Sequence, residues 1–495
     1  MLMGLLIKLI DYKNAKVMKT LNYIIIKPRN TINLSLFEGE RYESAILIQQ
    51  LVGNLVYFSN YGRYEPRIAS SWRKINDRTW SFKFRKKFKT ELNEEINPLT
   101  FKKSLERSIF IFEKNGGVPI LSNLTGYRDF IDKSKDKTLD QLPNLSGLVV
   151  EDDNLIFNFD VGIKSGLLQI LSFSPFGFIS RENFDHNGNW KNNERFISSG
   201  PYKVESMLLG HSYNLVKNEN WQDFSIDSPS NIIITHDDNI DFQNKNVIID
   251  AFTNEYKQEN LNKYKLVPEY LNSVLIGNYE TGFFSDKKNR RAFRKKFNSN
   301  VIELLPEQFG VNTRSLNFYP NQKNTEIFND DFGDLLHKRP QILIIEGDIP
   351  IEGTSRWYAW LVLKKTLEDL NWDYKFNGNK SIFTEMTNRK YDIRIRGSSI
   401  GGGVESWGLY IAFCSSVGIN FPDPNNRVCS LLNRFDADLI SEKQMTSDFF
   451  EAIEDEAAIL PVSHYGVSLF ISDTINTSSI SPLLAIIKFD KLVID

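Results

Sequence analysis

Two arginines stand one residue apart in a stretch where apolar and polar residues alternate, Tyr391-Asp392-Ile393-Arg394-Ile395-Arg396. Alternation with a period of two is typical of a strand with one buried face, so Arg394 and Arg396 are predicted to share the polar face. A guanidinium group presents a planar fork of donors that matches a carboxylate or a phosphate. The pair is therefore a candidate clamp for an anionic ligand. The alternatives are a solvent-facing strand surface and an internal salt bridge.

No other grouping of residues predicts a reaction centre. Serine, histidine and acidic residues do not occur in the motif context of a catalytic triad, and no His or Cys pair has metal-ligand spacing. Gly401-Gly402-Gly403 permits unusual backbone angles, but no strand, GxxxxGK motif and helix surround it, so it is not a phosphate loop. We therefore expect no enzyme activity, no cofactor and no metal site.

The charge balance argues against nucleic acid as a partner. Lys and Arg number 60 and Asp and Glu number 62, which gives a net charge of −2 and no global field for DNA or RNA. The strongest basic run, 290–296, has Ala292, Phe293 and Phe297 at helical spacing, which predicts a helix with its cations on a solvated face. We expect no nucleic-acid partner.

The amino terminus does not identify the compartment. The apolar run Met1–Ile10 is too short to span a bilayer and is a poor export signal. Met18 as the true start, an atypical signal and a missing signal all stay open, and no later stretch predicts membrane insertion. Cys414 and Cys429 are close enough to pair but too few for a disulfide scaffold.

The elements that position these residues are of mixed type. A chain of 495 residues predicts about three domains, or one two-lobed body with inserts. Periodicity predicts strands and helices in interleaved order, and hence an α/β or α+β fold. The expected strands are 21–28, 80–84, 155–161, a pair in 202–216, 341–345, 373–376 and 391–395. The expected helices are 41–56, 101–112, 289–300, 356–370 and 447–458, the last stopped by Pro461.

Several motifs follow one another in the order of a known family. The chain resembles the family 5 extracellular solute-binding proteins of ABC importers, which include the oligopeptide- and dipeptide-binding proteins. The resemblance covers about residues 20 to 495, and the order of the motifs makes it specific. The matching segments are 42–56, Pro66 to Trp72, Thr79 to Phe88, Pro98 to Arg107, Ser199 to Tyr202, Leu215 to Trp221, Phe283 to Phe297, Tyr391 to Gly397 and Ile459-Leu460-Pro461. One departure is Thr90-Glu91-Leu92-Asn93, where the family has an "hdG" turn.

The resemblance implies a two-lobed, periplasmic-binding-protein-like Venus flytrap of class II with an extra third domain. By position, lobe I would hold residues 20–55, 175–265 and 465–495, the extra domain 56–174, and lobe II 266–464. Two lobes that close on a ligand at a hinge bury it in the cleft between them.

The resemblance also implies ligand-binding residues. In the family's peptide binders an acidic residue after the "yDi...g" strand pairs with the peptide α-amino group. Glu405 takes this place if the chain runs on without a gap, and Asn420 does if the gap falls late, with loss of the charge. Glu405 is preferred; its alternative is a solvated loop residue. Trp407 would supply a cleft wall or else pack in the core.

The leading prediction is a non-catalytic, monomeric protein that captures a peptide or peptide-like solute and delivers it to an ABC transporter permease. A periplasmic or cell-surface location is expected from the family. The alternative is a cytoplasmic flytrap that senses a ligand and acts on another protein. An enzyme acting in the cleft has no motif in its favour.

Overall fold

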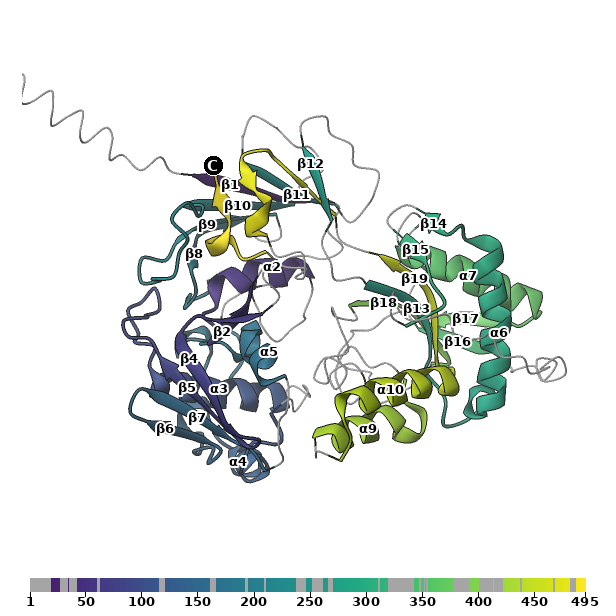
Figure 1. Cartoon of the computed structure of the whole chain (residues 1–495), viewed down its shortest axis with the longest axis horizontal. Coiled ribbons are helices and arrows are strands. Elements are labelled where there is room, and N and C mark those ends of the chain that lie inside the picture. Colours follow the sequence, from purple (N-terminus) through teal and green to yellow (C-terminus); the bar gives the residue numbers. More distant parts are fainter. Residues whose placement is uncertain are drawn as a thin grey trace, which may run out of the picture.

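The structure is a computed structural model of the 495-residue chain. The residues that it describes are 19–26, 34, 42–59, 63–114, 121–160, 166–191, 195–208, 211–236, 246–251, 261–265, 270–309, 312–318, 342–346, 349–350, 352, 355–377, 391–399, 413, 422–436, 439–465, 468–480 and 487–495. They form two bodies, each built around its own sheet of seven strands (Figure 1).

The first body is built around a sheet whose strands come from distant parts of the chain. The sheet has the order β12-β20-β11-β1-β10-β9-β8, and β1 is parallel to both of its neighbours. Alternate residues of β1 are fully buried, Leu21 and Ile25 among them, as the apolar run predicts. The strands are β1 (Thr20–Ile26), β8 (Tyr202–Leu208), β9 (Ser212–Lys217), β10 (Asn231–His236), β11 (Val247–Ala251), β12 (Asn262–Lys265) and β20 (Ser468–Ile471).

A smaller antiparallel sheet and several helices extend the first body. The sheet has the order β4-β5-β7-β6, and Trp80, Phe82 and Phe84 point into one core shared with the larger sheet. The elements are α2 (Tyr42–Leu51), β2 (Val56–Phe58), β3 (Tyr64–Pro66), β4 (Ala69–Asn76), β5 (Thr79–Phe84), α3 (Pro98–Lys114), α4 (Tyr127–Ser134), β6 (Leu148–Glu151), β7 (Asn154–Asn158), α5 (Leu167–Ser172), β21 (Ile475–Asn476) and β22 (Val493–Ile494). Short 3₁₀ turns are Leu139–Gln141, Ser174–Phe176, Arg181–Asn183, Thr477–Ser479 and Phe489–Lys491.

The second body has a sheet with helices on both faces. The order is β14-β15-β19-β13-β18-β16-β17, with β16, β17 and β18 parallel. Helices α6 and α7 share one core with the sheet, and α9 and α10 share another. The elements are β13 (Tyr270–Ile276), α6 (Lys287–Leu304), β14 (Gln308–Phe309), β15 (Asn312–Arg314), β16 (Leu343–Glu346), α7 (Ser355–Asp369), β17 (Tyr374–Asn377), β18 (Ile393–Ser399), α9 (Arg427–Asp436), α10 (Glu442–Glu456) and β19 (Ile459–Tyr465), with 3₁₀ turns at Phe283–Ser285 and Pro424–Asn426.

The chain crosses between the two sheets twice. It passes from β12 to β13 between Lys265 and Tyr270, and it returns from β19 to β20 between Tyr465 and Ser468. The predicted domain boundaries at 56, 175, 266 and 465 stay predictions.

Most predicted elements are present, and two features differ. The predicted helix 41–56 ends at Leu51, because Val56 already begins the short strand β2. Pro461 does not stop α10: the helix ends at Glu456, Ala457 takes a left-handed conformation with φ of 51°, and Pro461 lies inside β19. The pairing of β19 with β13 is irregular at this point, where Ser273 faces Pro461, and a bulge accommodates a residue without an N–H group.

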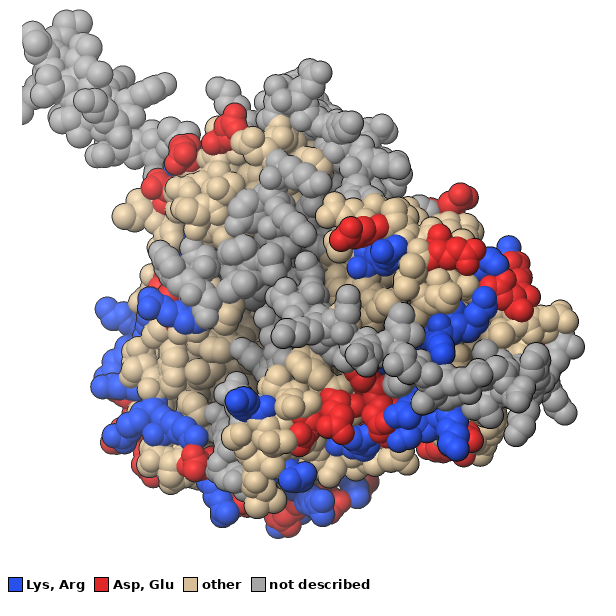
Figure 2. All heavy atoms as spheres, turned by 45° about the vertical axis from the view of Figure 1, so that its right-hand side comes forward, with Lys and Arg blue, Asp and Glu red and all other residues tan. Residues whose placement is uncertain are grey.

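The basic run on α6 is not a solvated surface. Arg290 and Arg294 are 1% and 2% exposed, and they pair with acidic residues at the carboxyl end of α10. Arg290 Nη2 lies 2.7 Å from Glu456 Oε2, and Arg294 Nη2 lies 2.5 Å from Glu454 Oε2. The expectation of a solvated helix face was therefore wrong, because α10 supplies acidic partners that are distant in sequence. Figure 2 shows acidic and basic areas side by side on this part of the molecule.

Candidate functional site

Arg394 and Arg396 lie in the first half of β18, at and beyond the carboxyl end of the parallel strand β16. On β18, Arg394 is paired in register with Glu346, the last residue of β16, so Arg396 extends past the end of that neighbour. The crevice beyond the carboxyl ends of parallel strands is the usual ligand position in open α/β sheets. The Nε atom of Arg394 lies 2.7 Å from Oε2 of Glu346, and the two side chains are 13% and 17% exposed.

Both arginines project from the face of the sheet opposite α6 and α7. Ile393, which directly precedes Arg394 on β18, is buried in the core that includes α6 and α7. Alternation along β18 therefore places Arg394 and Arg396 on the other face. On that face Leu275, which is paired with Arg394, packs with α9 and α10. In Figure 1 α6 and α7 lie on the far side of the sheet from the first body, so the arginine face is turned toward it.

The environment of Arg396 disfavours its charged form. Burial and, to a smaller extent, the neighbouring guanidinium of Arg394 lower the pKa of Arg396 to about 9, while Tyr391 and Glu346 oppose this effect. A cation that is disfavoured by burial is stabilised by a nearby anion. Arg394 is in contact with Glu346.

The other predicted ligand residues cannot be placed. Glu405, Trp407 and Asn420 lie outside the described residues, as does the glycine triplet that precedes them. Their roles stay predictions. The closest described residue on the carboxyl side of Asn420 is Pro422.

Asp423 fixes the chain directly after this stretch. Its two carboxylate oxygens accept hydrogen bonds from the backbone N–H groups of Val428 and Cys429, at 2.9 and 3.0 Å. The carboxylate thus caps the first turn of α9. Burial raises the pKa of Asp423, and these hydrogen bonds counteract that effect. Sequence reasoning missed this role, although Asp-Pro immediately before a helix is a recognisable start signal.

Cys429 is disulfide-bonded. The chain has one other cysteine, Cys414, which lies outside the described residues. The sulfur of Cys429 is therefore not a free thiol. Cys429 lies in the first turn of α9, next to the cap formed by Asp423.

His464 is buried next to the end of β19. It is 3% exposed, and its Nε2 lies 3.0 Å from the carbonyl oxygen of Asn317. Burial lowers the pKa of His464 to about 4, and the contact with Asn317 opposes this shift. The ring is therefore neutral at pH 7, with Nε2–H as the donor to Asn317.

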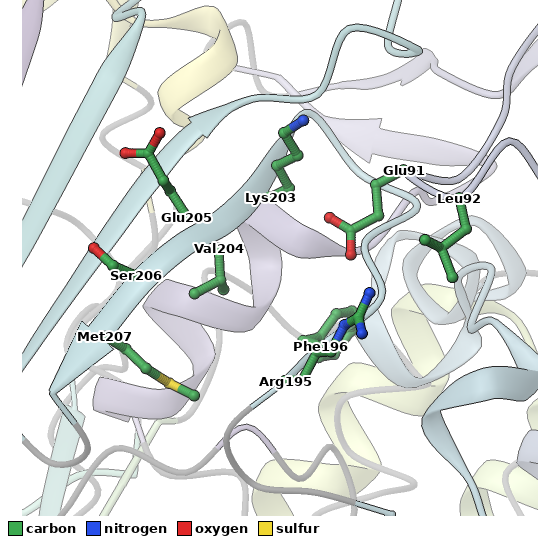
Figure 3. A pocket seen from close by; sticks show the side chains of 9 residues that line it. All are labelled: Glu91, Leu92, Arg195, Phe196, Lys203, Val204, Glu205, Ser206 and Met207. Carbon is green, nitrogen blue, oxygen red and sulfur yellow. The ribbon is translucent and has the colours of Figure 1, made fainter.

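A separate hollow with a volume of 460 Å³ lies on the first body. It is bounded by strand β8, by the turn that carries Glu91 and Leu92, and by Arg195 and Phe196. Figure 3 shows β8 along one side and Glu91 with Arg195 along the other. None of the ligand residues predicted from the sequence borders it. The lining residues are Glu91, Leu92, Arg195, Phe196, Lys203, Val204, Glu205, Ser206 and Met207.

Two further features of the described residues bear on the site. No group of three or more His, Cys, Asp or Glu side chains within the described ranges is placed to hold a metal ion. Among the helices described, none combines the length and the apolar character needed to cross a bilayer.

Comparison with known proteins identifies the fold. The chain is similar to the murein tripeptide binding protein MppA of Escherichia coli, with 15% identity, a TM-score of 0.72, and coverage of 97% of this chain and 99% of that one. It is similar to OppA of Haemophilus influenzae in complex with the peptide RPPGFSPFR, with 14% identity, a TM-score of 0.74 and coverage of 96% and 99%. It is also similar to NikA of Brucella suis in complex with Fe(III)-EDTA, with 16% identity, a TM-score of 0.66 and coverage of 96% and 100%. These likenesses establish the two-lobed, mixed α/β fold that the sequence predicts.

A family model adds sequence support to the shared fold. No curated protein matches the sequence. The model of the bacterial extracellular solute-binding proteins, family 5 Middle, matches residues 63–303, which span the extension of the first body and reach into α6. Over residues 63–303 this match confirms the predicted resemblance to the family 5 extracellular solute-binding proteins of bacteria.

Proposed function

We propose that this protein captures a peptide or a peptide-like solute between its two bodies and delivers it to an ABC importer. The observation that carries the proposal is the pair Arg394 and Arg396 in a chain with the family 5 fold. Arg394 lies opposite the last residue of β16, and Arg396 lies two residues further along β18, on the face turned toward the first body. A peptide carboxylate there would pair with Arg396, while Arg394 stays in contact with Glu346.

The remaining contacts of the proposed site come from the stretch between β18 and α9. Glu405 or Asn420 would meet the peptide α-amino group, and Trp407 would line an apolar part of the ligand. Backbone hydrogen bonds to an extended ligand would give affinity with little dependence on ligand side chains. The protein would bind its ligand without chemical turnover.

The proposed location is outside the cytoplasm, in the periplasm or at the cell surface. The disulfide of Cys429 supports this location, because disulfides persist in oxidising compartments and are rare in the cytosol. The partner would be the membrane permease of an ABC importer, which would dock the closed form.

Native mass spectrometry of the protein purified from its own host tests the proposal first. Cleft binders retain ligands through purification, so we expect a mixture of bound masses that resolves into short peptides after denaturation. A single non-peptide mass would keep the binding function and change the ligand class. A protein that carries no ligand and also fails to bind a mixture of short peptides would contradict the proposal.

The role of Arg396 is tested by calorimetric titration with a peptide found in that way. Arg396→Gln should weaken binding about ten- to hundred-fold, because a hydrogen bond to a charged group contributes about 1.5–3 kcal/mol. Arg78→Gln is the matched control, since Arg78 is exposed in the turn between β4 and β5. Equal affinities of the wild type and the Arg396→Gln variant would remove Arg396 from the site.

Blocking the peptide amino group separates the two candidates for its partner. If Glu405 pairs with that group, Glu405→Gln should weaken binding of the free peptide and leave binding of its acetylated form unchanged. If Asn420 occupies the position, Asn420→Asp should strengthen binding of the free peptide alone.

A further inference from the structure

The side chains of Lys488 and Gln49 meet in the first body, although they are far apart in sequence. Lys488 directly precedes the 3₁₀ turn Phe489–Lys491, and Gln49 lies in the last turn of α2. The Nζ atom of Lys488 is in contact with Oε1 of Gln49. Gln49 is 8% exposed and Lys488 is half-buried. A primary amine thus lies against the carbonyl group of a side-chain amide, in a place that is largely closed to water.

Gln50, the next residue on α2, holds the backbone on both sides of Lys488. Its Nε2 donates a hydrogen bond to the carbonyl oxygen of Ile487, at 2.8 Å. Its Oε1 accepts a hydrogen bond from the N–H group of Phe489, at 3.1 Å. Gln50 is fully buried, so these bonds do not compete with water. They fix Lys488 relative to α2, and a fixed contact between two groups raises their effective concentration by orders of magnitude.

The surroundings of Lys488 favour an uncharged amine. Burial and, to a smaller extent, the charge of Arg67 lower the pKa of Lys488 to about 7, while Asp490 opposes this shift. An amine attacks a carbonyl carbon only in its uncharged form. Desolvation and a neighbouring cation are two ways in which proteins activate a lysine as a nucleophile. Both act on Lys488.

Asp490 supplies a carboxylate oxygen for proton transfer. One of its oxygens, Oδ1, accepts a hydrogen bond from Nη2 of Arg67, at 2.9 Å. The other oxygen, Oδ2, has no hydrogen-bond partner among the described residues. Asp490 is fully buried and close enough for its charge to act on Lys488. A positioned carboxylate can accept a proton from one reacting group and deliver it to another.

We propose that Lys488 and Gln49 become joined by an intramolecular isopeptide bond. The uncharged Nζ attacks Cδ of Gln49, the Nζ–Cδ bond forms and the Cδ–Nε2 bond breaks. Asp490 accepts the proton that Nζ loses and passes it to the departing nitrogen, so that one molecule of ammonia leaves. The step is a transfer of an acyl group between two nitrogens, and it needs no oxidant and no further reactant. The bond links α2 covalently to the carboxyl-terminal segment within the first body, and it does not depend on the proposed function.

Mass spectrometry of the full chain tests the proposal. After reduction of the disulfide, we expect the intact mass to lie below the mass of the sequence by one molecule of ammonia. Trypsin should then release a branched peptide that joins residues 42–63 to residues 444–491, because trypsin does not cleave after a lysine whose amine is acylated. Fragmentation of this peptide should locate the link at Gln49 and Lys488.

Variants of the neighbouring residues show whether the site acts as proposed. Lys488→Arg should restore the full mass, because a guanidinium group does not displace ammonia from an amide. Lys491→Arg is the matched control and should keep the cross-link, since Nζ of Lys491 donates to Oδ2 of Asp223, at 2.9 Å. Asp490→Asn should slow formation of the bond at least ten-fold. If that variant does not fold, Gln49→Met takes its place and should also show the full mass.

The peptide map of the wild type decides the question without any variant. The proposal is overturned if the intact mass equals that of the sequence and trypsin cleaves after Lys488. It is also overturned if Lys488→Arg loses ammonia to the same extent as the wild type, because the loss would then arise elsewhere, for example by cyclisation of an asparagine.

Discussion

At the scale of single residues, His464 makes the stability of the fold depend on pH. Its folded-state pKa of about 4 is below the ordinary value of 6.5. Between these values the unfolded chain binds a proton that the folded chain does not bind, so the free energy of unfolding falls as the pH is lowered from 6.5 to 4. The loss over this window is about 3 kcal/mol, and above pH 6.5 the contribution of His464 is complete.

Replacing His464 by glutamine tests this contribution. Gln keeps an N–H donor for the carbonyl of Asn317 and does not titrate. We expect the free energy of unfolding, measured in urea at pH 7 and at pH 4.5, to fall by about 2 to 3 kcal/mol less in the variant than in the wild type. Parallel pH profiles for the two proteins would show that His464 is not the group responsible.

The close approach of Gly397 to Tyr465, the last residue of β19, makes a second prediction at this scale. A Cβ atom at Gly397 on β18 would lie 2.7 Å from the hydroxyl oxygen of Tyr465, so Gly397→Ala should destabilise the protein by about 1–3 kcal/mol. Tyr465→Phe removes the contacted oxygen. Thermal unfolding of the double variant should show a smaller loss than the sum of the two single losses.

Sequence reasoning at this scale succeeds where a residue's role depends on its near neighbours in the chain. The shared face of Arg394 and Arg396 follows from local alternation. The ion pairs of Arg290 and Arg294 do not, because their acidic partners lie about 160 residues away on α10. The hollow beside β8 was missed for the same reason: its turn, its cations and its strand meet only after the sheet has formed.

At the scale of elements, the disulfide of Cys429 is expected to stabilise the start of α9. Cys429→Ser should lower the free energy of unfolding by about 2–4 kcal/mol, the usual contribution of a disulfide. Urea unfolding with and without reductant measures it: reductant should bring the wild type to the level of the variant and leave the variant unchanged. A wild type that does not respond to reductant would show that the bond does not contribute.

The periodic elements could be predicted from the sequence because each has one buried face. β5, α3, α6, α7 and β17 lie where periodicity placed them. The ends of elements were predicted less well. Helix α10 begins at Glu442, five residues before the predicted start, because Ser441 caps it by accepting a hydrogen bond from the backbone of Gln444, at 3.2 Å. The position of Pro461 inside a strand depends on a bulge that only the pairing with β13 creates.

At the scale of the whole molecule, the order of the motifs predicted the two-lobed fold, and composition alone did not. The family resemblance predicted that each lobe is built from separate parts of the chain. Short-range sequence patterns could not predict this, because strands that are neighbours in a sheet come from distant parts of the chain. Neighbouring strands β1 and β10 are more than two hundred residues apart in sequence. Among the described strands, the order along the chain changes body between β12 and β13 and between β19 and β20, so closure on a ligand would use backbone rotation at these connections.

The position of β20 also constrains how the protein is made. This strand lies between β11 and β12 in the sheet of the first body, yet it is synthesised after every strand and helix of the second body. During translation β11 therefore waits with an open edge while more than two hundred residues emerge. Asp490, which pairs with the buried Arg67 at 2.9 Å, arrives later still. The amino-terminal body of this protein is thus completed last, so a ribosome that stalls before residue 468 leaves a chain with an exposed strand edge.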